Sequence, residues 1–133
     1  MKVNKLNHVA IAVRDIEKQL SFFCGILGVP SGEIIELPSQ GVKVAFLELP
    51  NVKLELIAPL DKTANLNKYL DKRGEGLHHI SLSVDDISDA IGGLTDKGVE
   101  PIDKTPRPGA EGKLVAFLNP KTTGGVLIEL EEE

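Results

Sequence analysis

The chain has 133 residues, of which 41% are hydrophobic and 26% are charged, and its formal net charge is −5. This length can bury a sizeable core, so the chain needs neither disulfides nor a metal merely to fold. The acidic balance argues against a nucleic-acid partner, because no basic field exists to meet a phosphate backbone. Cys24 is the only cysteine, which excludes an intramolecular disulfide and fits a reducing, cytoplasmic location. No apolar segment approaches membrane-spanning length, so we expect neither a membrane partner nor a signal peptide.

One sequence motif occurs twice in the chain, 71 residues apart. The first copy, beginning at Leu6, reads LNHVAIAVRDI, and the second copy, beginning at Leu77, reads LHHISLSVDDI. A repeat of this length predicts a duplicated half-domain rather than a solenoid unit.

The first half of the chain predicts one strand, one helix and three further strands. After a strand at residues 6–13, Asp15 can cap a helix that ends near Gly28. Three strand-like runs follow, at residues 32–38, 42–49 and 52–59, and Pro50–Asn51 is a plausible hairpin turn. A short helix ending at Gly74 then precedes the second half.

The second half predicts the same order of elements. After a strand at residues 77–84, Asp86 can cap a helix that ends near Gly98. Strands are predicted at residues 99–105, 113–120 and 125–132. We therefore expect an α+β fold in a single domain, residues 1–133, built from two tandem βαβββ modules at about 4–60 and 75–133. The modules would form one curved, partly open eight-stranded sheet around a cleft, with helices on its outer face.

A histidine lies on a strand face with only small residues in each copy. Because side chains alternate across a strand, His8 shares a face with Ala10 and Ala12, and His79 shares a face with Ser81 and Ser83. Packed cores are filled to high density, so these small residues suggest space reserved for a ligand. His78 points to the opposite face and is expected to be structural or at a rim, and the terminal Glu131–Glu133 run is expected to be solvated.

A glutamate lies within the last apolar strand of each half, Glu55 in one and Glu129 in the other. A carboxylate among Leu, Ile and Val is costly to bury unless it is paired, hydrogen-bonded or bound to metal. Any one such residue is ordinarily structural or solvated, but two histidines and two glutamates at matched positions favour a metal site. Imidazole and carboxylate ligands suit one divalent ion such as Co, Zn, Mn or Ni.

The chain resembles the vicinal-oxygen-chelate superfamily and, within it, the family of methylmalonyl-CoA epimerases. The segments that carry the resemblance are LNHVAIAVRDIEK, KLELIAPL, GEGLHHISLSVDDI and FLNPKTTGGVLIELEE. Glyoxalases, dioxygenases and antibiotic-binding proteins share the paired-module pattern. The more specific signal is NPKTTGGVLIEL, with PRPGAEGK before it.

The resemblance implies a metal held by His8, His79 and Glu129, with Glu55 completing or supporting the site. It also implies interconversion of (R)- and (S)-methylmalonyl-CoA by removal and return of the C2 proton through a metal-chelated enolate, and a homodimer. The chemistry is consistent, because a Lewis acid stabilises the enolate and bases on its two faces allow inversion. Glu129 and Glu48 are the candidate bases.

Some family members have a glutamate base at the position of Val44, and valine cannot take a proton. Glu48 would instead share a face with Glu55 if Pro50–Asn51 closes a hairpin. The alternative is an exposed ion pair between Glu48 and Lys53.

Three cations of the second half, Arg107, Lys113 and Lys121, could meet the phosphates of coenzyme A, although each could equally be an ordinary surface residue. A second departure from the family is Asn119, where relatives often have histidine. Two other functions remain open: a glyoxalase-type isomerase acting on a glutathione hemithioacetal, and a metal-free small-molecule binding protein. An iron dioxygenase is less favoured, because its triad leaves free the position that Glu55 could occupy.

Overall fold

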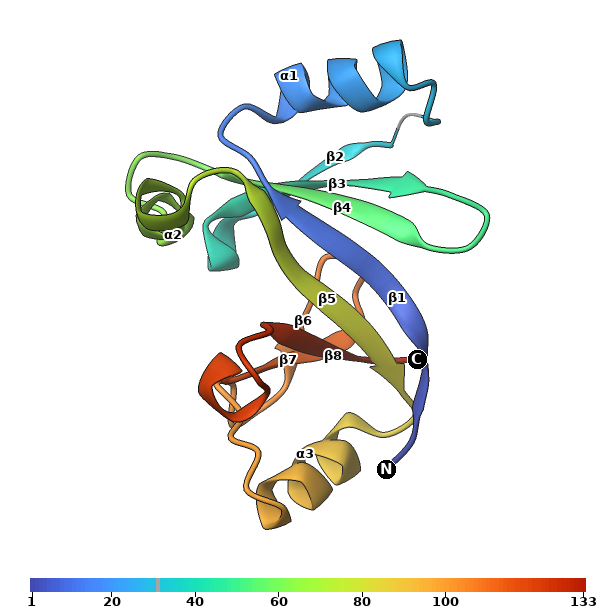
Figure 1. Cartoon of the computed structure of the whole chain (residues 1–133), viewed down its shortest axis with the longest axis vertical. Coiled ribbons are helices and arrows are strands. Elements are labelled where there is room, and N and C mark those ends of the chain that lie inside the picture. The colour runs from blue at the N-terminus through green and yellow to red at the C-terminus, as the bar shows by residue number, and fades with distance from the viewer. Residues whose placement is uncertain (31) are drawn as a thin grey trace. The chain divides into compact units, whose positions relative to one another are not determined.

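The computed structural model describes residues 1–30 and 32–133 (Figure 1). Its contacts divide the chain into two compact units, one made of Met1–His8 with His79–Glu133 and the other of Val9–His78. Two strands pass from one unit into the other: β1 (Val3–Ala12) and β5 (Gly76–Val84).

The unit Val9–His78 holds strands in the order β2-β3-β4-β1, in which β3 pairs antiparallel with both β2 and β4. Its other strands are β2 (Ile34–Leu37), β3 (Val42–Glu48) and β4 (Lys53–Pro59). The predicted hairpin turn joins β3 to β4, and there the Leu49 N–H donates to the Val52 carbonyl over 3.0 Å.

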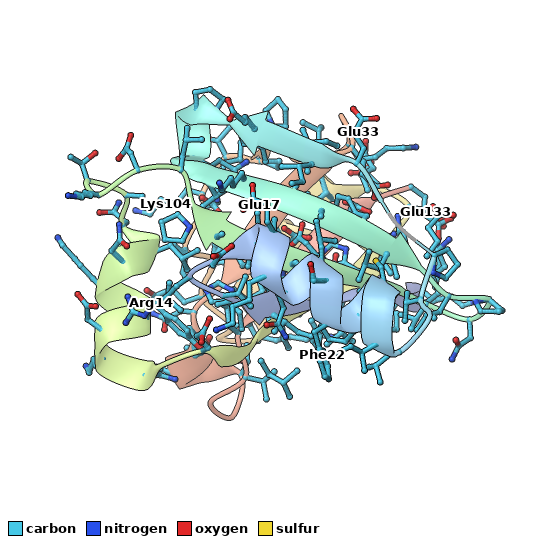
Figure 2. The ribbon with its side chains drawn as sticks, turned by 90° about the horizontal axis from the view of Figure 1, so that it is seen from above. Arg14, Glu17, Phe22, Glu33, Lys104 and Glu133 are labelled. Atoms are coloured by element: carbon cyan, nitrogen blue, oxygen red, sulfur yellow. The ribbon has the colours of Figure 1, made fainter. Side chains whose placement is uncertain are left out.

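One helix covers the apolar face of this sheet. Helix α1 (Ile16–Leu20) continues as a π-helical segment, Ser21–Ile26, and Figure 2 shows both, with Glu17 and Phe22 labelled, crossing in front of the strands. Ile16 is fully buried in the core of this unit, whose other buried members are Val13, Ala45, Leu47, Leu56 and Ala58. The short helix α2 (Leu66–Arg73) follows β4 and ends, as expected, at Gly74.

The other unit holds strands in the order β5-β8-β7-β6, in which β5 and β8 are parallel and the other neighbours are antiparallel. Its further elements are α3 (Ile87–Asp96), β6 (Arg107–Pro108), β7 (Leu114–Leu118) and β8 (Ile128–Glu132). One face of these strands packs against α3 through a core of Val84, Ile87, Ala90, Ile91, Ala116, Leu118 and Leu130. The predicted α+β class and the βαβββ order of each half are confirmed.

Both predicted helix caps are present. The Asp15 carboxylate accepts a hydrogen bond from the Lys18 N–H, and the Asp86 carboxylate accepts one from the Asp89 N–H, each over 3.0 Å. An unpaired N–H at the first turn of a helix is satisfied in this way, which fixes where each helix begins. Gly98, just after α3, has a φ of 87°, a conformation that costs glycine little.

The predicted strand at residues 99–105 is wrong. Only Pro101 makes an isolated bridge there, to Leu118, and the strand beside β7 begins later, at Arg107. The physical reason is a side chain: an Asp103 carboxylate oxygen accepts the Phe117 N–H over 2.8 Å. This bond takes a donor that a continuing backbone ladder would need.

The expectation that Glu131–Glu133 is a solvated end is wrong for Glu131 and Glu132, and only Glu133 is exposed. Glu131 is only 6% exposed, and the Glu132 carboxylate accepts the Ile87 N–H over 3.1 Å at the start of α3. The last strand therefore runs through these residues to Glu132. Within the described part of the chain, no helix is long and apolar enough to cross a membrane.

Candidate metal centre

Three buried side chains, His8, His79 and Glu129, converge in the unit that contains both ends of the chain. Each offers one ligand atom, and these atoms lie within 4.8 Å of one another. The Nε2 atom of His8 lies 3.4 Å from Nε2 of His79 and 3.4 Å from Oε1 of Glu129. The side chains are almost wholly removed from solvent, with exposed fractions of 2%, 5% and 8% for the three residues.

Strand register brings these residues to one face. In the parallel pair of β5 and β8, Ser81 lies opposite Glu129. Because side chains alternate along a strand, His79 shares the face of Ser81. The bulky residues of β5 and β8 point the other way, into the core under α3. The small residues that the sequence places beside the histidines, Ala10, Ala12, Ser81 and Ser83, are buried as well.

The neighbour of His8 determines which of its ring nitrogens can act as a ligand. The Nδ1 atom of His8 lies 2.7 Å from Oδ1 of Asn7, and an amide oxygen can only accept a hydrogen bond. The proton of a neutral His8 is thus on Nδ1, and the lone pair is on Nε2, which faces His79 and Glu129. Such outer contacts orient the histidine ligands of metals and raise their basicity.

The second histidine is oriented by an aromatic contact. The rings of His79 and Phe117 meet edge to face, with centroids 5.0 Å apart and planes at 88°. Phe117 lies opposite Glu129 in the pairing of β7 with β8, so one phenyl ring packs against a histidine of the group and borders its carboxylate.

Glu129 is a costly residue to bury. Desolvation by burial raises the pKa of its carboxyl group from 4.5 to about 7, while the nearby Ser81 hydroxyl and the Arg107 charge oppose that rise. Its Oε1 atom makes no hydrogen bond within the described residues. A buried carboxylate is costly unless it is paired, hydrogen-bonded or bound to a cation, and a metal ion at this group would meet that requirement.

The three residues fit a divalent metal. Two ligand atoms that each lie about 2.1 Å from an ion are separated by about 3.0 to 3.4 Å at octahedral or tetrahedral angles. The separations between Nε2 of His8 and its two neighbours are at the upper end of that range. Two imidazoles and one carboxylate suit Zn, Co, Ni, Mn or Fe and leave positions open for a substrate.

Glu55, the fourth predicted ligand, lies in the other unit on β4 and is buried, with 6% exposed. It lies opposite Phe46 of β3, and Glu48 lies opposite Lys53 at the end of the same hairpin. The predicted sharing of one face by Glu48 and Glu55 is therefore confirmed. Glu48 is exposed, and Val44, at the position of a glutamate in some family members, is buried.

The three predicted phosphate-binding cations have different surroundings. Lys113 and Lys121 are exposed, the first just before β7 and the second in a short turn at Pro120–Thr122. Arg107 is half-buried, with Nε 3.3 Å from an Asp103 oxygen and the guanidinium carbon 5.9 Å from the Phe117 ring centre. Asn119 caps the short turn, since its Oδ1 accepts the Lys121 N–H over 3.0 Å.

His78 is structural, as its position on the strand predicts. Its ring meets that of Tyr69 edge to face at 4.6 Å. Burial, and secondarily the charge of Arg73, lowers the pKa of His78, which favours its neutral form.

Several residues of this region were missed by the sequence analysis. Glu131 is a second buried acid on the face of Glu129, opposite Ser83, and the strand alternation from Glu129 to Glu131 was the available signal. Ser81 and Ser83, which the sequence analysis did place on this face, are buried, and among the described residues the Ser83 hydroxyl has no hydrogen-bond partner. Asn7 precedes its histidine directly in sequence, and no pattern distinguishes such a neighbour from an ordinary strand residue.

Comparison with known proteins gives a consistent family. The profile of the glyoxalase/bleomycin resistance protein/dioxygenase superfamily matches residues 7–117. A protein of Mus musculus named "Methylmalonyl-CoA epimerase, mitochondrial" is 43% identical over 98% of this chain and 74% of its own length. An "Ethylmalonyl-CoA/methylmalonyl-CoA epimerase" of Cereibacter sphaeroides is 40% identical over 98% of both chains.

Solved structures give the same picture. The crystal structure of methylmalonyl-CoA epimerase from Mycobacterium tuberculosis has a TM-score of 0.91 at 35% identity, covering 98% of this chain and 88% of that one. A methylmalonyl-CoA epimerase in complex with methylmalonyl-CoA and NH4+ has a TM-score of 0.93 at 30% identity, covering 99% and 96%. The likeness thus extends over nearly the whole chain at identities well above those at which only a fold is shared. This chain belongs to the glyoxalase/bleomycin resistance protein/dioxygenase superfamily and, within it, to the methylmalonyl-CoA epimerase family.

Proposed function

We propose that this chain is a metal-dependent isomerase that interconverts (R)- and (S)-methylmalonyl-CoA. The observation that carries the proposal is the buried group of His8, His79 and Glu129 in a chain whose relatives bear the name of this epimerase.

The reaction needs a stabilised carbanion. The C2 proton of the substrate lies between a thioester carbonyl and a carboxylate, and its loss places negative charge on oxygen. A divalent cation held by His8, His79 and Glu129 would supply Lewis-acid stabilisation of that charge. Asn7 holds His8 in the tautomer that serves as a ligand, and the low exposure of the three residues excludes water from their surroundings.

Glu129 is the first candidate for the proton transfer itself. Its support is its position, because it is buried beside both histidines, where one carboxylate could serve as a ligand and as a base. Glu48 is the candidate for the opposite face of the planar intermediate. Its support is that it shares the strand face of Glu55, and its alternative is an exposed pairing with Lys53.

The remaining assignments rest on the sequence and family pattern. We propose Glu55 as the fourth ligand or its support, and a metal among Co, Zn, Mn and Ni, which the nitrogen and oxygen donors suit. Lys113 and Lys121 are exposed and are the candidates for the coenzyme A phosphates. A single domain, a homodimer and a cytoplasmic location also remain predictions, and the mouse relative is named mitochondrial.

The decisive experiment follows the C2 proton. Pure protein, stripped of metal and reloaded with Co, Zn, Mn or Ni, is incubated with one epimer of methylmalonyl-CoA in deuterated water. We expect deuterium at C2 and racemisation with the loaded protein, and neither with the stripped protein.

Failure of every loaded form to exchange the proton would remove the proposal. Two controls separate the alternatives. Turnover of the glutathione hemithioacetal of methylglyoxal, without exchange of the acyl-CoA, would instead identify a glyoxalase-type isomerase. Stoichiometric binding of a ligand without any retained metal would identify a binding protein.

A further inference from the structure

One cation lies next to the candidate metal centre, and its surroundings differ from those of a surface charge. Arg107 begins β6 and lies opposite Val115 of β7, which in turn lies opposite Glu131 of β8. Because paired residues share a face of a sheet and alternate residues return to it, Arg107 is on the same face as Phe117 and Glu129. Its long side chain therefore belongs to the face that carries the metal ligands.

Two contacts fix the position of the Arg107 side chain. Its Nε atom lies 3.3 Å from one oxygen of Asp103, four residues earlier. The other Asp103 oxygen accepts the Phe117 N–H over 2.8 Å, so a single carboxylate ties the arginine to strand β7. Its guanidinium carbon then lies 5.9 Å from the centre of the Phe117 ring, which itself packs against His79.

The side chain remains available to a ligand despite these contacts. It is 39% exposed, while its Nε atom is buried and makes no hydrogen bond to the part of the chain that the structure describes. The exposed area consequently lies on other atoms of the side chain.

Charge on this face favours an anion-binding role for Arg107. Two buried acids, Glu129 and Glu131, occupy the same face, and the substrate of the proposed function adds a carboxylate of its own. The charges of Arg107 and Glu129 already interact. A guanidinium group binds a carboxylate through two parallel N–H donors, a geometry that a lysine lacks.

We propose that Arg107 is the residue that binds the free carboxylate of the acyl group, and that it does not bind the phosphates of coenzyme A. The inference rests on the proposed function. It makes Arg107 the residue that selects malonyl-type thioesters over simple acyl-CoA esters, which carry the same phosphates but no such carboxylate.

The test compares two ligands that differ only in that carboxylate. Dissociation constants of metal-loaded protein are measured for an equilibrated mixture of the methylmalonyl-CoA epimers and for propionyl-CoA. In Arg107→Gln, we expect methylmalonyl-CoA to bind about 10- to 100-fold more weakly, the factor that one charge-assisted hydrogen bond supplies. Propionyl-CoA should bind with unchanged affinity, and Arg107→Lys should restore part of the loss, because it returns the charge without the paired donors.

Kinetic and structural controls accompany the binding data. The KM for epimerisation should rise with the dissociation constant, and metal content and Tm should show whether the variant remains folded and loaded. Lys104→Gln removes a positive charge from the same loop, adjacent to Asp103, and should change neither affinity.

Three results would overturn the inference. Equal weakening of both ligands in Arg107→Gln would assign Arg107 to the coenzyme phosphates. Unchanged binding of both ligands would show that Arg107 contacts neither. An equal loss in Lys104→Gln would show that the effect comes from the overall positive charge of the loop and not from Arg107 itself. An inactive wild-type protein would instead remove the proposed function, which the deuterium experiment detects independently of any Arg107 variant.

Discussion

The two halves of the chain build the same strand pair and use it differently. In each, a buried glutamate lies opposite a phenylalanine with a cation over its ring: Glu55, Phe46 and Lys53 in the pair of β3 with β4, and Glu129, Phe117 and Arg107 in the pair of β7 with β8. The cation lies 5.4 Å from the ring centre in the first pair and 5.9 Å in the second. The matched glutamate and phenylalanine thus recur in both halves, whereas the cation comes from β4 in the first half and from β6 in the second.

The two strand pairs differ at the position two residues away from each glutamate. Val44 lies opposite Ile57 in the first pair, whereas Val115 lies opposite Glu131 in the second. The second half therefore carries an additional buried acid, and its unit also contains both histidines of the candidate metal centre. The repeated strand pair places one buried glutamate at the same position in each half. Substitutions at neighbouring positions, such as Glu131 in place of Ile57, change how many acids surround it.

The largest effect is expected from loss of a histidine of the candidate metal centre. We expect His79→Ala to abolish stoichiometric metal and to lower epimerase activity by at least about a thousandfold, because the Lewis acid is lost with its ligand. Metal analysis of untagged protein and the deuterium-exchange rate measure both effects. His78→Ala is the matched control, since that ring packs on Tyr69, and metal retention by His79→Ala would contradict the assignment.

The sequence could predict these positions because they follow from periodicity. The repeat placed one histidine and one glutamate in each half, and the alternation of each strand placed them on a face that is indeed buried. Helix starts were equally accessible, since an aspartate such as Asp15 satisfies a local N–H whatever the tertiary structure.

The remainder depended on contacts that no local pattern contains. The edge strand β6 has two residues, too few for a period, and its place is decided by the bond from the distant Phe117 N–H to Asp103. Glu131 looks like part of an acidic tail until β8 is found to pair with β5 and β7 on either side. Composition favours solvent for such a run, and tertiary pairing overrides that preference.

The next largest effect is expected from substitution of the matched glutamates, Glu129 and Glu55. Glu129→Gln keeps the shape of the side chain but removes its charge and its ability to take a proton, so we expect exchange to fall by about 100- to 10,000-fold. Glu55→Gln retains an oxygen ligand and should cost about tenfold or less. The ratio of the two deuterium-exchange rates is the measurement, and equal losses would mean that the halves contribute equivalently.

The contact between Asn7 and His8 gives a smaller effect. Asn7→Leu preserves approximate size but removes the acceptor that holds Nδ1, and we expect metal affinity to fall by about 10- to 100-fold. Asn7→Asp keeps an acceptor and should bind metal at least as tightly as the wild type. Competition with a coloured chelator measures the affinities, and an unchanged value in Asn7→Leu would assign the tautomer to other contacts.

The smallest effect is expected in the metal-free protein, as a function of pH. Burial raises the pKa of Glu129 from 4.5 to about 7, so between these values the folded state holds a proton that the unfolded state has released. The free energy of unfolding contributed by this group therefore falls as pH rises from about 4.5 to about 7. Glu129→Gln lacks the titration, so the Tm of the wild type should decline relative to that of the variant across this interval.

Metal binding should reverse this pH dependence of stability. An ion that requires the ionised carboxylate stabilises the folded state in the range where the metal-free protein loses stability. Added metal should accordingly raise the Tm of the wild type more at pH 7 than at pH 5, and raise that of Glu129→Gln much less at either pH. Parallel Tm profiles for the two metal-free proteins would show that burial does not raise the pKa of Glu129 and would contradict this prediction.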